Sequence, residues 1–279
     1  MSERAFSASR GRGAIHARDV VGRFTTKLAL LLIFVTGYAF PAQPPAEIQR
    51  YLQQPGFRWT CARQTNFQFC WEANLDRDAN MASARNSAEA SRSEILRFAR
   101  VSKYEAVIYV FFLESPERME TLIGYRGEGR SRPAQHAIFF VPTPIRPNLT
   151  HELCHEILTN VWGAAEAWIE EGLATFVAER GVVHQTCLAM TVRQALLPLK
   201  ELVRADWNPT VYSPDVTYVE LGGFLEFLER AYGLERVKQI WQHGSELIPS
   251  ILGKSLAALE DEWHLQLQHE IASRSAPRI

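Results

Sequence analysis

Residues 106–113 read AVIYVFFL, and this apolar stretch decides the fold class. It contains neither Gly nor Pro, and its β-branched and aromatic side chains favour a buried strand. The next segment, SPERMETLIG, predicts a helix with Ser115 as its N-cap and Gly124 at its end. A second apolar strand is expected at 137–141, which read AIFFV. The middle of the chain therefore predicts strands joined by a helix.

The segments on either side of these strands complete an α+β pattern. Residues 57–72 (FRWTCARQTNFQFCWE) predict a β-hairpin, and residues 86–100 predict a helix. Residues 125–135 are polar and contain glycines, which is typical of a loop. After the prolines at 142–147, nearly all of the remaining sequence has a helical pattern. Strands with helices, followed by helices alone, predict an α+β fold.

We expect a single folded domain over residues 57–275. Its first part, 57–145, contains the sheet, and its second part, 146–275, is helical. Residues 40–56 are rich in Pro and are expected to form a linker with a short helical turn. A chain of 279 residues, 47% of them hydrophobic, is long enough for such a domain.

The composition excludes several classes of protein. Lys and Arg number 30 and Asp and Glu number 31, which gives a net charge of −1. A protein that binds nucleic acid normally has a basic surplus, and this chain has none. The hydrophobic content of 47% also excludes a disordered or collagen-like chain.

The first 39 residues have the pattern of a secretory signal peptide. A basic segment, 1–27, precedes the apolar run 28–40, which reads LALLLIFVTGYAF. This run is shorter than the ~20 residues that a helix needs to cross a bilayer. Small residues near its end predict cleavage after Ala39. The alternative is an uncleaved anchor that tethers the domain to a membrane, and in both cases the remaining chain is expected to be periplasmic or secreted.

The four cysteines are typical of a protein from an oxidising compartment. Cys61 and Cys70 flank the expected hairpin, and a two-residue turn at 65–66 places them opposite each other. We therefore expect a Cys61–Cys70 disulfide. Cys154 and Cys187 then pair by elimination, or they remain as two buried thiols.

Residues 151–155 read HELCH, which matches the HExxH pattern of zinc hydrolases. On a helix, His151 and His155 lie about 40° apart around the axis, so both imidazoles can bind one metal ion. Glu152 lies beside them and can serve a metal-bound water without being a ligand. Cys154 is expected to pack or to form a disulfide, although a fourth ligand at this position would make the site structural.

A third ligand is expected in residues 167–176, which read AWIEEGLATF. A Trp-x-x-Glu-Gly-x-Ala helix downstream of HExxH resembles the gluzincin metallopeptidases, in particular the peptidase MA-like group. The resemblance covers about residues 57–270, and the two motifs are its specific parts. In that group the Glu before the Gly is the third zinc ligand, which implies Glu171. Glu170 is the alternative.

The resemblance implies a zincin-like fold and a peptidase that depends on Zn²⁺. The ligands would be His151, His155 and Glu171, and Glu152 would act as general base on the zinc-bound water. Gluzincin aminopeptidases carry a Gly-x-Met-x-Asn strand that this chain lacks. An endopeptidase that cleaves peptides or proteins is therefore expected.

The resemblance also implies a residue that stabilises the oxyanion. Tyr218 is the candidate, because it lies in residues 217–241, where the family shows a similar pattern of aromatic residues. Tyr212 and His184 are the alternatives. His136 precedes the second strand, where it either lines the cleft or is a solvated loop residue.

Further residues are expected to support the metal and the substrate. In thermolysin-like enzymes an Asp four residues after the third ligand orients a ligand His, and Thr175 stands at that position here. Trp168 is expected to form a wall of the site. In zincins the strand before the metal helix is an edge that pairs with extended substrate, which implies Ile138, Phe139 and Phe140. If this strand alternates, either Phe139 or Phe140 is exposed.

Two other classes of function fit the same residues. A non-catalytic zinc-binding module would keep the ligands and bind a peptide or a partner protein. A structural extracytoplasmic domain would carry HExxH by chance. The substitution Glu152→Gln distinguishes the peptidase from the binding module, because it should abolish hydrolysis in the first case and leave binding unchanged in the second.

Overall fold

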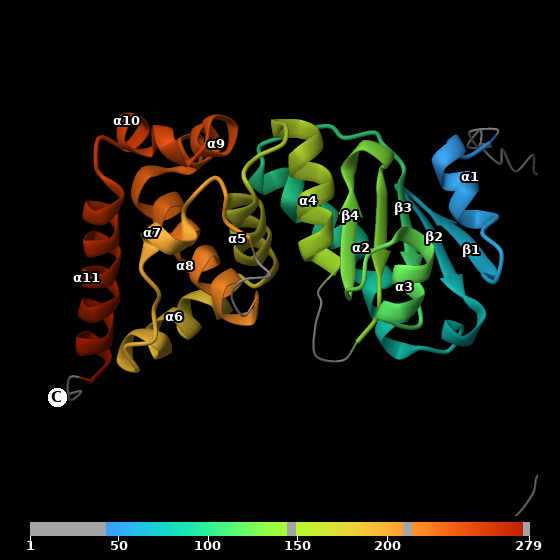
Figure 1. The fold of residues 1–279 in the computed structure, drawn as a ribbon, viewed down its shortest axis with the longest axis horizontal. Helices are drawn as coiled ribbons and strands as arrows, with labels where there is room; N and C mark the ends of the chain where they lie inside the picture. Colours follow the sequence, from blue (N-terminus) through green and yellow to red (C-terminus); the bar gives the residue numbers. More distant parts are fainter. Residues whose placement is uncertain (1–42, 144–148, 209–213, 276–279) are drawn as a thin grey trace, which may run out of the picture. The chain divides into compact units, whose positions relative to one another are not determined.

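Five strands form one mixed sheet in the computed structural model, which describes residues 43–143, 149–208 and 214–275. The strands are β1 (Trp59–Gln64), β2 (Phe67–Glu72), β3 (Ile108–Phe112), β4 (Gly129–Arg132) and β5 (Ala137–Phe140). They lie in the order β1-β2-β3-β5-β4, so β1 and β4 are the two edges (Figure 1). β2, β3 and β5 are parallel to one another, whereas β1 and β4 run antiparallel to their neighbours.

The helices confirm the α+β class, because they alternate with strands up to β5 and follow one another after it (Figure 1). Gln43–Ile279 form one compact unit. The α-helices of the described residues are α1 (Ala46–Leu52), α2 (Ala79–Phe98), α3 (Pro116–Ile123), α4 (Leu149–Trp162), α5 (Ala167–Ala178), α6 (Val182–Val192), α7 (Leu199–Leu202), α8 (Pro214–Tyr232), α9 (Leu234–His243), α10 (Ile248–Leu252) and α11 (Leu256–Ser275).

The helix α3 confirms the prediction made from its end residues. Ser115 Oγ accepts the backbone N–H of Arg118 at 3.3 Å, as expected of an N-cap. Gly124 ends the helix with φ of 71°, a left-handed conformation that glycine adopts readily. The helix expected at 86–100 is the second part of the longer helix α2.

Helices cover both faces of the sheet. On one face, Tyr51 of α1 packs edge-on against Phe139 of β5, with ring centroids 4.9 Å apart, and Met119 of α3 is buried in the same cluster. On the other face, side chains of α2 and α4 pack with Phe140 in the main core. Burial on both faces is the physical reason that β3 and β5 are apolar at every position.

β5 is an interior strand of the sheet. The prediction that it is an edge strand that pairs with substrate is therefore wrong. β3 pairs with one side of β5 and β4 pairs with the other, which leaves the expected residues Ile138, Phe139 and Phe140 without a free edge. Phe139 and Phe140 are 0% and 3% exposed. The expectation that one of them is exposed is also wrong, because each of them packs under a different helical layer.

One free edge of the sheet is β4, which lies within the segment expected to be a loop. Its sequence is GRSR. The guanidinium of Arg132 donates to the Tyr51 hydroxyl at 2.5 Å and to the Ile123 carbonyl at 2.8 Å, which fixes the end of the strand. A four-residue polar edge strand lacks the apolar alternation that identifies a strand in a sequence.

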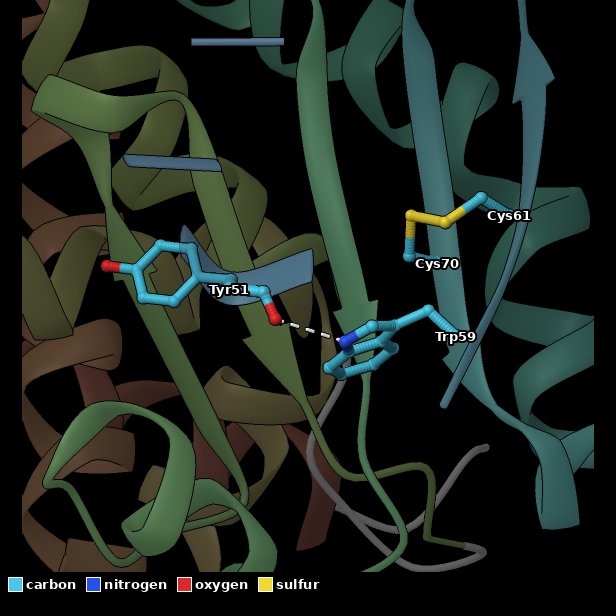
Figure 2. The surroundings of a disulfide bond; sticks show 4 residues. All are labelled: Tyr51, Trp59, Cys61 and Cys70. Carbon is cyan, nitrogen blue, oxygen red and sulfur yellow. Dashed lines mark hydrogen bonds between the residues drawn. A yellow bond between two sulfur atoms is a disulfide. The ribbon is translucent and has the colours of Figure 1, made fainter. Parts of the chain in front are cut away.

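The hairpin of β1 and β2 has the expected register and the expected disulfide (Figure 2). Cys61 lies opposite Cys70, and the two form a disulfide bond. Thr65, in the two-residue turn, has a positive φ of 37°, as tight hairpin turns favour. The indole N–H of Trp59 donates to the carbonyl of Tyr51 at 3.1 Å, which ties the hairpin to α1.

The second disulfide expected by elimination is absent. Cys154 on α4 and Cys187 on α6 are both free and buried, which confirms the alternative of two buried thiols. Cys154 packs in the main core. Cys187 Sγ donates to the Val219 carbonyl at 3.6 Å, and a Cβ at Gly223 would overlap this sulfur. Each thiol therefore fills a packed position on its own helix.

The start of the chain was expected to contain a signal and a linker. The expected signal peptide or anchor, 1–39 with its apolar run 28–40, lies outside the described residues. The helical turn expected in the Pro-rich segment is α1, and its Ile48 and Tyr51 are buried. α1 therefore belongs to the folded unit rather than to a linker. In the part of the chain that the structure describes, no helix is long and apolar enough to span a membrane.

Candidate metal centre

Two adjacent helices bring three metal-binding side chains together. α4 carries His151 and His155 one turn apart, and α5 carries Glu171. The Nε2 atoms of the two histidines are 3.1 Å apart. Glu171 Oε2 lies 3.1 Å from Nε2 of His151 and 3.4 Å from Nε2 of His155. These three atoms converge on one point that a metal ion can occupy.

The spacing of the three atoms fits a tetrahedral ion. Ligand atoms about 2.0–2.1 Å from a tetrahedral zinc lie about 3.3–3.4 Å from one another, and the measured separations are 3.1–3.4 Å. The side chains of His151, His155 and Glu171 are 16%, 12% and 20% exposed, so solvent reaches the group. Two imidazoles and one carboxylate with access to solvent form a donor set that could hold a metal ion and leave one position open.

Glu171, and not the alternative Glu170, lies at the group. Glu170 instead accepts the backbone N–H of Ala165 at 3.1 Å, at the start of its own helix. Gly172, next to the ligand, lies where α5 meets α8, and a Cβ at this position would come within 2.8 Å of Leu221 Cβ. The glycine therefore lets the two helices pack closely beside the metal ligand.

Glu152 lies beside the two histidines but outside the group of ligand atoms. It is buried, and the α-carbon of Gly129 on β4 packs against its carboxylate, because a Cβ at this glycine would overlap Glu152 Oε1. Burial raises the pKa of Glu152, and the charges of His151 and His155 offset part of this effect. A buried carboxyl with a raised pKa is suited to accept and return a proton.

The charges of the ligand residues favour an ionised carboxylate. Burial alone would lower the pKa of His155, but the charge of Glu171 and its hydrogen bond raise this pKa to about 9. Burial would raise the pKa of Glu171, but His155 and His151 hold it well below its usual range. Glu171 is therefore ionised, and binding of a metal ion requires His155 to lose its proton.

Tyr218 of α8 lies at the site. Its ring stacks on that of His151, with centroids 6.0 Å apart and an angle of 10° between the planes. Burial, the charge of Glu171 and a hydrogen bond with Glu171 raise the pKa of the Tyr218 hydroxyl. The hydroxyl therefore stays protonated and can donate a hydrogen bond. The alternative Tyr212 lies outside the described residues.

Three other residues expected at the site have different roles. His184 Nε2 bonds to Glu270 of α11 at 2.7 Å. Trp168 is fully buried, and its indole N–H donates to Glu166 at 2.6 Å, so it belongs to the core rather than to a wall of the site. Thr175 is also buried, and its Oγ1 has no hydrogen-bond partner among the described residues. The expectation that Thr175 orients a ligand histidine is therefore wrong, because the packing around α5 encloses its short side chain.

A second polar cluster ties α4 to the segments that precede β3 and β5. Glu156, next to the ligand His155, is fully buried, and its Oε1 accepts the Tyr104 hydroxyl at 2.9 Å and bonds His136 Nδ1 at 2.8 Å. The hydrogen bond with Glu156 raises the pKa of His136. His136 is therefore an anchor for α4, which carries His151 and His155. The sequence does not predict Tyr104 and His136 as partners of Glu156, because the three residues come from separate segments without a shared motif.

Two residues near the site lie in the segment that was expected to be a loop. The ring of Tyr125 packs on Gly127, where a Cβ would overlap it. Burial raises the pKa of the Tyr125 hydroxyl, Arg130 lowers it, and Glu152 and Glu171 raise it further. The guanidinium carbon of Arg130 lies 5.2 Å from the centre of this ring. The sequence does not predict that Tyr125 and Arg130 lie near the site, because polar residues between glycines have no pattern that indicates a tertiary contact.

Comparisons with known proteins do not assign the chain to a family. No protein-family model matches the chain, and no curated protein matches it. The function is therefore argued from the geometry of the site and from the chemistry of its residues.

Proposed function

We propose that this chain is a zinc-dependent metallopeptidase of the gluzincin type, which cleaves within peptides or proteins outside the cytoplasm. The observation that carries the proposal is the triangle of His151 Nε2, His155 Nε2 and Glu171 Oε2, with Glu152 beside it. Two imidazoles and one carboxylate favour zinc over the harder cations Mg²⁺ and Ca²⁺. When bound, zinc supplies a Lewis acid that polarises a peptide carbonyl and lowers the pKa of water.

Glu152 is the general base of the proposed reaction. Its carboxylate accepts a proton from the attacking water and delivers it to the amine nitrogen as the C–N bond breaks. The burial that raises its pKa supports both proton transfers. The Tyr218 hydroxyl turns from Glu171 to the oxyanion and donates its hydrogen bond there, since its raised pKa keeps it protonated.

The free edge of β4 supports an extended peptide as the substrate. β4 pairs with β5 on one side only, and its first residue, Gly129, packs against Glu152. A peptide that adds to this edge as a further strand places a backbone carbonyl close to the metal ligands. The sheet, the helix with the two histidines and the helices after it also support a zincin-like domain. The Cys61–Cys70 disulfide supports an oxidising compartment.

The first test is the zinc content of the full-length chain. We expect about one zinc per chain in the parent protein and a clear loss in Glu171→Ala. The matched control is Glu170→Ala, which removes the neighbouring carboxylate that binds a backbone N–H instead of facing the group. A folded parent chain without zinc would overturn the proposal. Full zinc in Glu171→Ala would overturn the ligand assignment.

The second test separates a peptidase from a zinc-binding module. The zinc-loaded parent is incubated with an unfolded protein such as reduced casein, and new amino termini are counted. Glu152→Gln should keep its zinc and lose hydrolysis, because an amide cannot accept the proton of the water. Zinc binding without hydrolysis by the parent, or equal hydrolysis by Glu152→Gln, contradicts the mechanism.

A further inference from the structure

Arg130 is an exposed cation on the free edge of β4. Its guanidinium lies over the ring of Tyr125, 5.2 Å from the ring centre. In the described part of the chain it forms no ion pair with a carboxylate. The ring beneath the guanidinium helps to hold it in place, while its N–H groups stay open to an anion.

The neighbouring arginines differ from Arg130 because they are already bonded. Arg126 pairs with Glu117 and Glu120 of α3. Arg132 donates to the Tyr51 hydroxyl and to a backbone carbonyl. Within this segment, Arg130 therefore has donors available for a ligand.

Arg130 is also close to the candidate metal centre. It follows Gly129, whose α-carbon packs against Glu152, and it pairs with Phe139, so its side chain leaves the edge strand on the other face of the sheet. Its positive charge acts on Glu152, and the ring beneath it belongs to Tyr125, whose hydroxyl is influenced by Glu152 and Glu171. The residue therefore stands beside the path of any peptide that pairs with β4.

We infer that Arg130 binds a carboxylate of the substrate close to the bond that is cut. This inference rests on the proposed function and names its substrate class: peptides that carry a carboxylate near the scissile bond. The carboxylate belongs either to an acidic side chain or to the free C-terminus of the peptide. Both present two oxygens that match the two parallel N–H groups of a guanidinium.

The test uses three pools of acetylated hexapeptides whose other positions are random and uncharged. The first pool has Glu at the fourth position and an amidated C-terminus. The second has Gln at that position and a free C-terminal carboxylate. The third has Gln and an amidated end. The zinc-loaded full-length chain is compared with Arg130→Gln, Arg130→Lys and the matched control Arg126→Gln, at low and at high salt.

The parent should cleave one of the two carboxylate pools about tenfold faster than the neutral pool, because a charge-assisted hydrogen bond contributes about that factor. The faster pool identifies the source of the carboxylate. Arg130→Gln should remove the preference, Arg130→Lys should keep part of it, and Arg126→Gln should leave it unchanged. High salt should weaken the preference in the parent. Equal cleavage of all three pools, or a preference that survives Arg130→Gln, overturns the inference.

Binding of the same pools separates a failure of this inference from a failure of the proposed function. If the zinc-loaded parent cleaves no pool, the peptidase proposal fails. Retention of the pools in equilibrium dialysis then shows whether Arg130 binds a carboxylate. Selective retention of a carboxylate pool that is lost in Arg130→Gln supports carboxylate binding by this residue. Equal retention of all pools overturns it.

Discussion

Gly129 leaves room for the carboxylate of Glu152. A Cβ at this position would overlap Glu152 Oε1 and come within 2.8 Å of Cδ. The backbone itself accepts alanine, because Gly129 is not in the left-handed region. Gly129→Ala should therefore displace Glu152 without unfolding the strand. We expect kcat for peptide hydrolysis to fall by about tenfold or more, with zinc still at about one per chain.

Ser131 offers a control on the same strand. It lies two residues after Gly129, and its buried hydroxyl has no hydrogen-bond partner in the described residues. Ser131→Ala should leave kcat and zinc content unchanged. Full kcat in Gly129→Ala would mean that the position of Glu152 is not important for hydrolysis.

Glu220 of α8 should make the stability depend on pH. Its side chain is fully buried, and its Oε1 accepts the backbone N–H of Leu197 at 2.7 Å. Burial raises the pKa of this carboxyl from 4.5 to about 7. The folded chain therefore binds more protons than the unfolded chain between these values. The contribution of Glu220 to the free energy of unfolding is fully present below pH 4.5 and is lost as the pH rises through 7.

The substitution Glu220→Gln tests this linkage. The free energy of unfolding of the parent should fall by about 1–3 kcal/mol more than that of Glu220→Gln between pH 5 and pH 8. The measurement is urea denaturation at several pH values. Glu260→Gln is the control, because Glu260 accepts the N–H of Leu199 in the same way but is less buried. Parallel pH profiles for the parent and Glu220→Gln would exclude the effect.

At the scale of the element, α4 depends on its bond to the segment before β3. The Tyr104 hydroxyl donates to buried Glu156 of α4 at 2.9 Å. Tyr104→Phe removes this donor and leaves a buried carboxylate with one partner fewer. We expect the free energy of unfolding to fall by about 1–3 kcal/mol. Urea denaturation measures the loss, and zinc affinity shows whether the ligand helix shifts as well.

A second tyrosine provides the matched control for this bond. Tyr232 donates to Glu262 at 2.7 Å, but this carboxylate is 39% exposed and also pairs with Lys254. Tyr232→Phe should lower the free energy of unfolding by less than Tyr104→Phe does, because water replaces the lost donor at a solvated carboxylate. Equal losses in the two variants would show that burial of Glu156 does not determine the cost.

At the scale of the whole molecule, local patterns were predicted and long-range pairings were not. The Cys61–Cys70 disulfide lies within one hairpin, so the turn length fixed its register. The two histidines lie on one helix, so their spacing in the sequence was enough to predict that their side chains lie together. The interior position of β5 depends on β4, whose polar sequence gave no strand signal. The free state of Cys154 likewise depends on how separate helices pack.

The residues around the metal ligands show the same division. The resemblance to the gluzincin peptidases implied Glu171, and the structure places it with the two histidines. Tyr125, Arg130 and the Glu156 cluster were not predicted, because each depends on contacts between segments distant in the sequence. Sequence spacing therefore identifies ligands on one element, whereas the residues that surround them require the tertiary fold.

Zinc at the proposed site should stabilise the molecule as a whole, because the three side chains that would bind it lie on two packed helices. α4 also packs on the sheet, and α5 packs on α8, so an ion bound by all three side chains would crosslink the two parts of the fold. Zinc at about a thousand times its Kd adds about 4 kcal/mol to the free energy of unfolding. For a unit of this size, that corresponds to a rise in Tm of about 8–16 °C. Calorimetry with and without a chelator measures the shift.

Glu171→Ala should lose most of this zinc-dependent shift, whereas Glu170→Ala should keep it. A Tm that does not respond to zinc in the parent would mean that the three side chains do not bind the ion in the folded state.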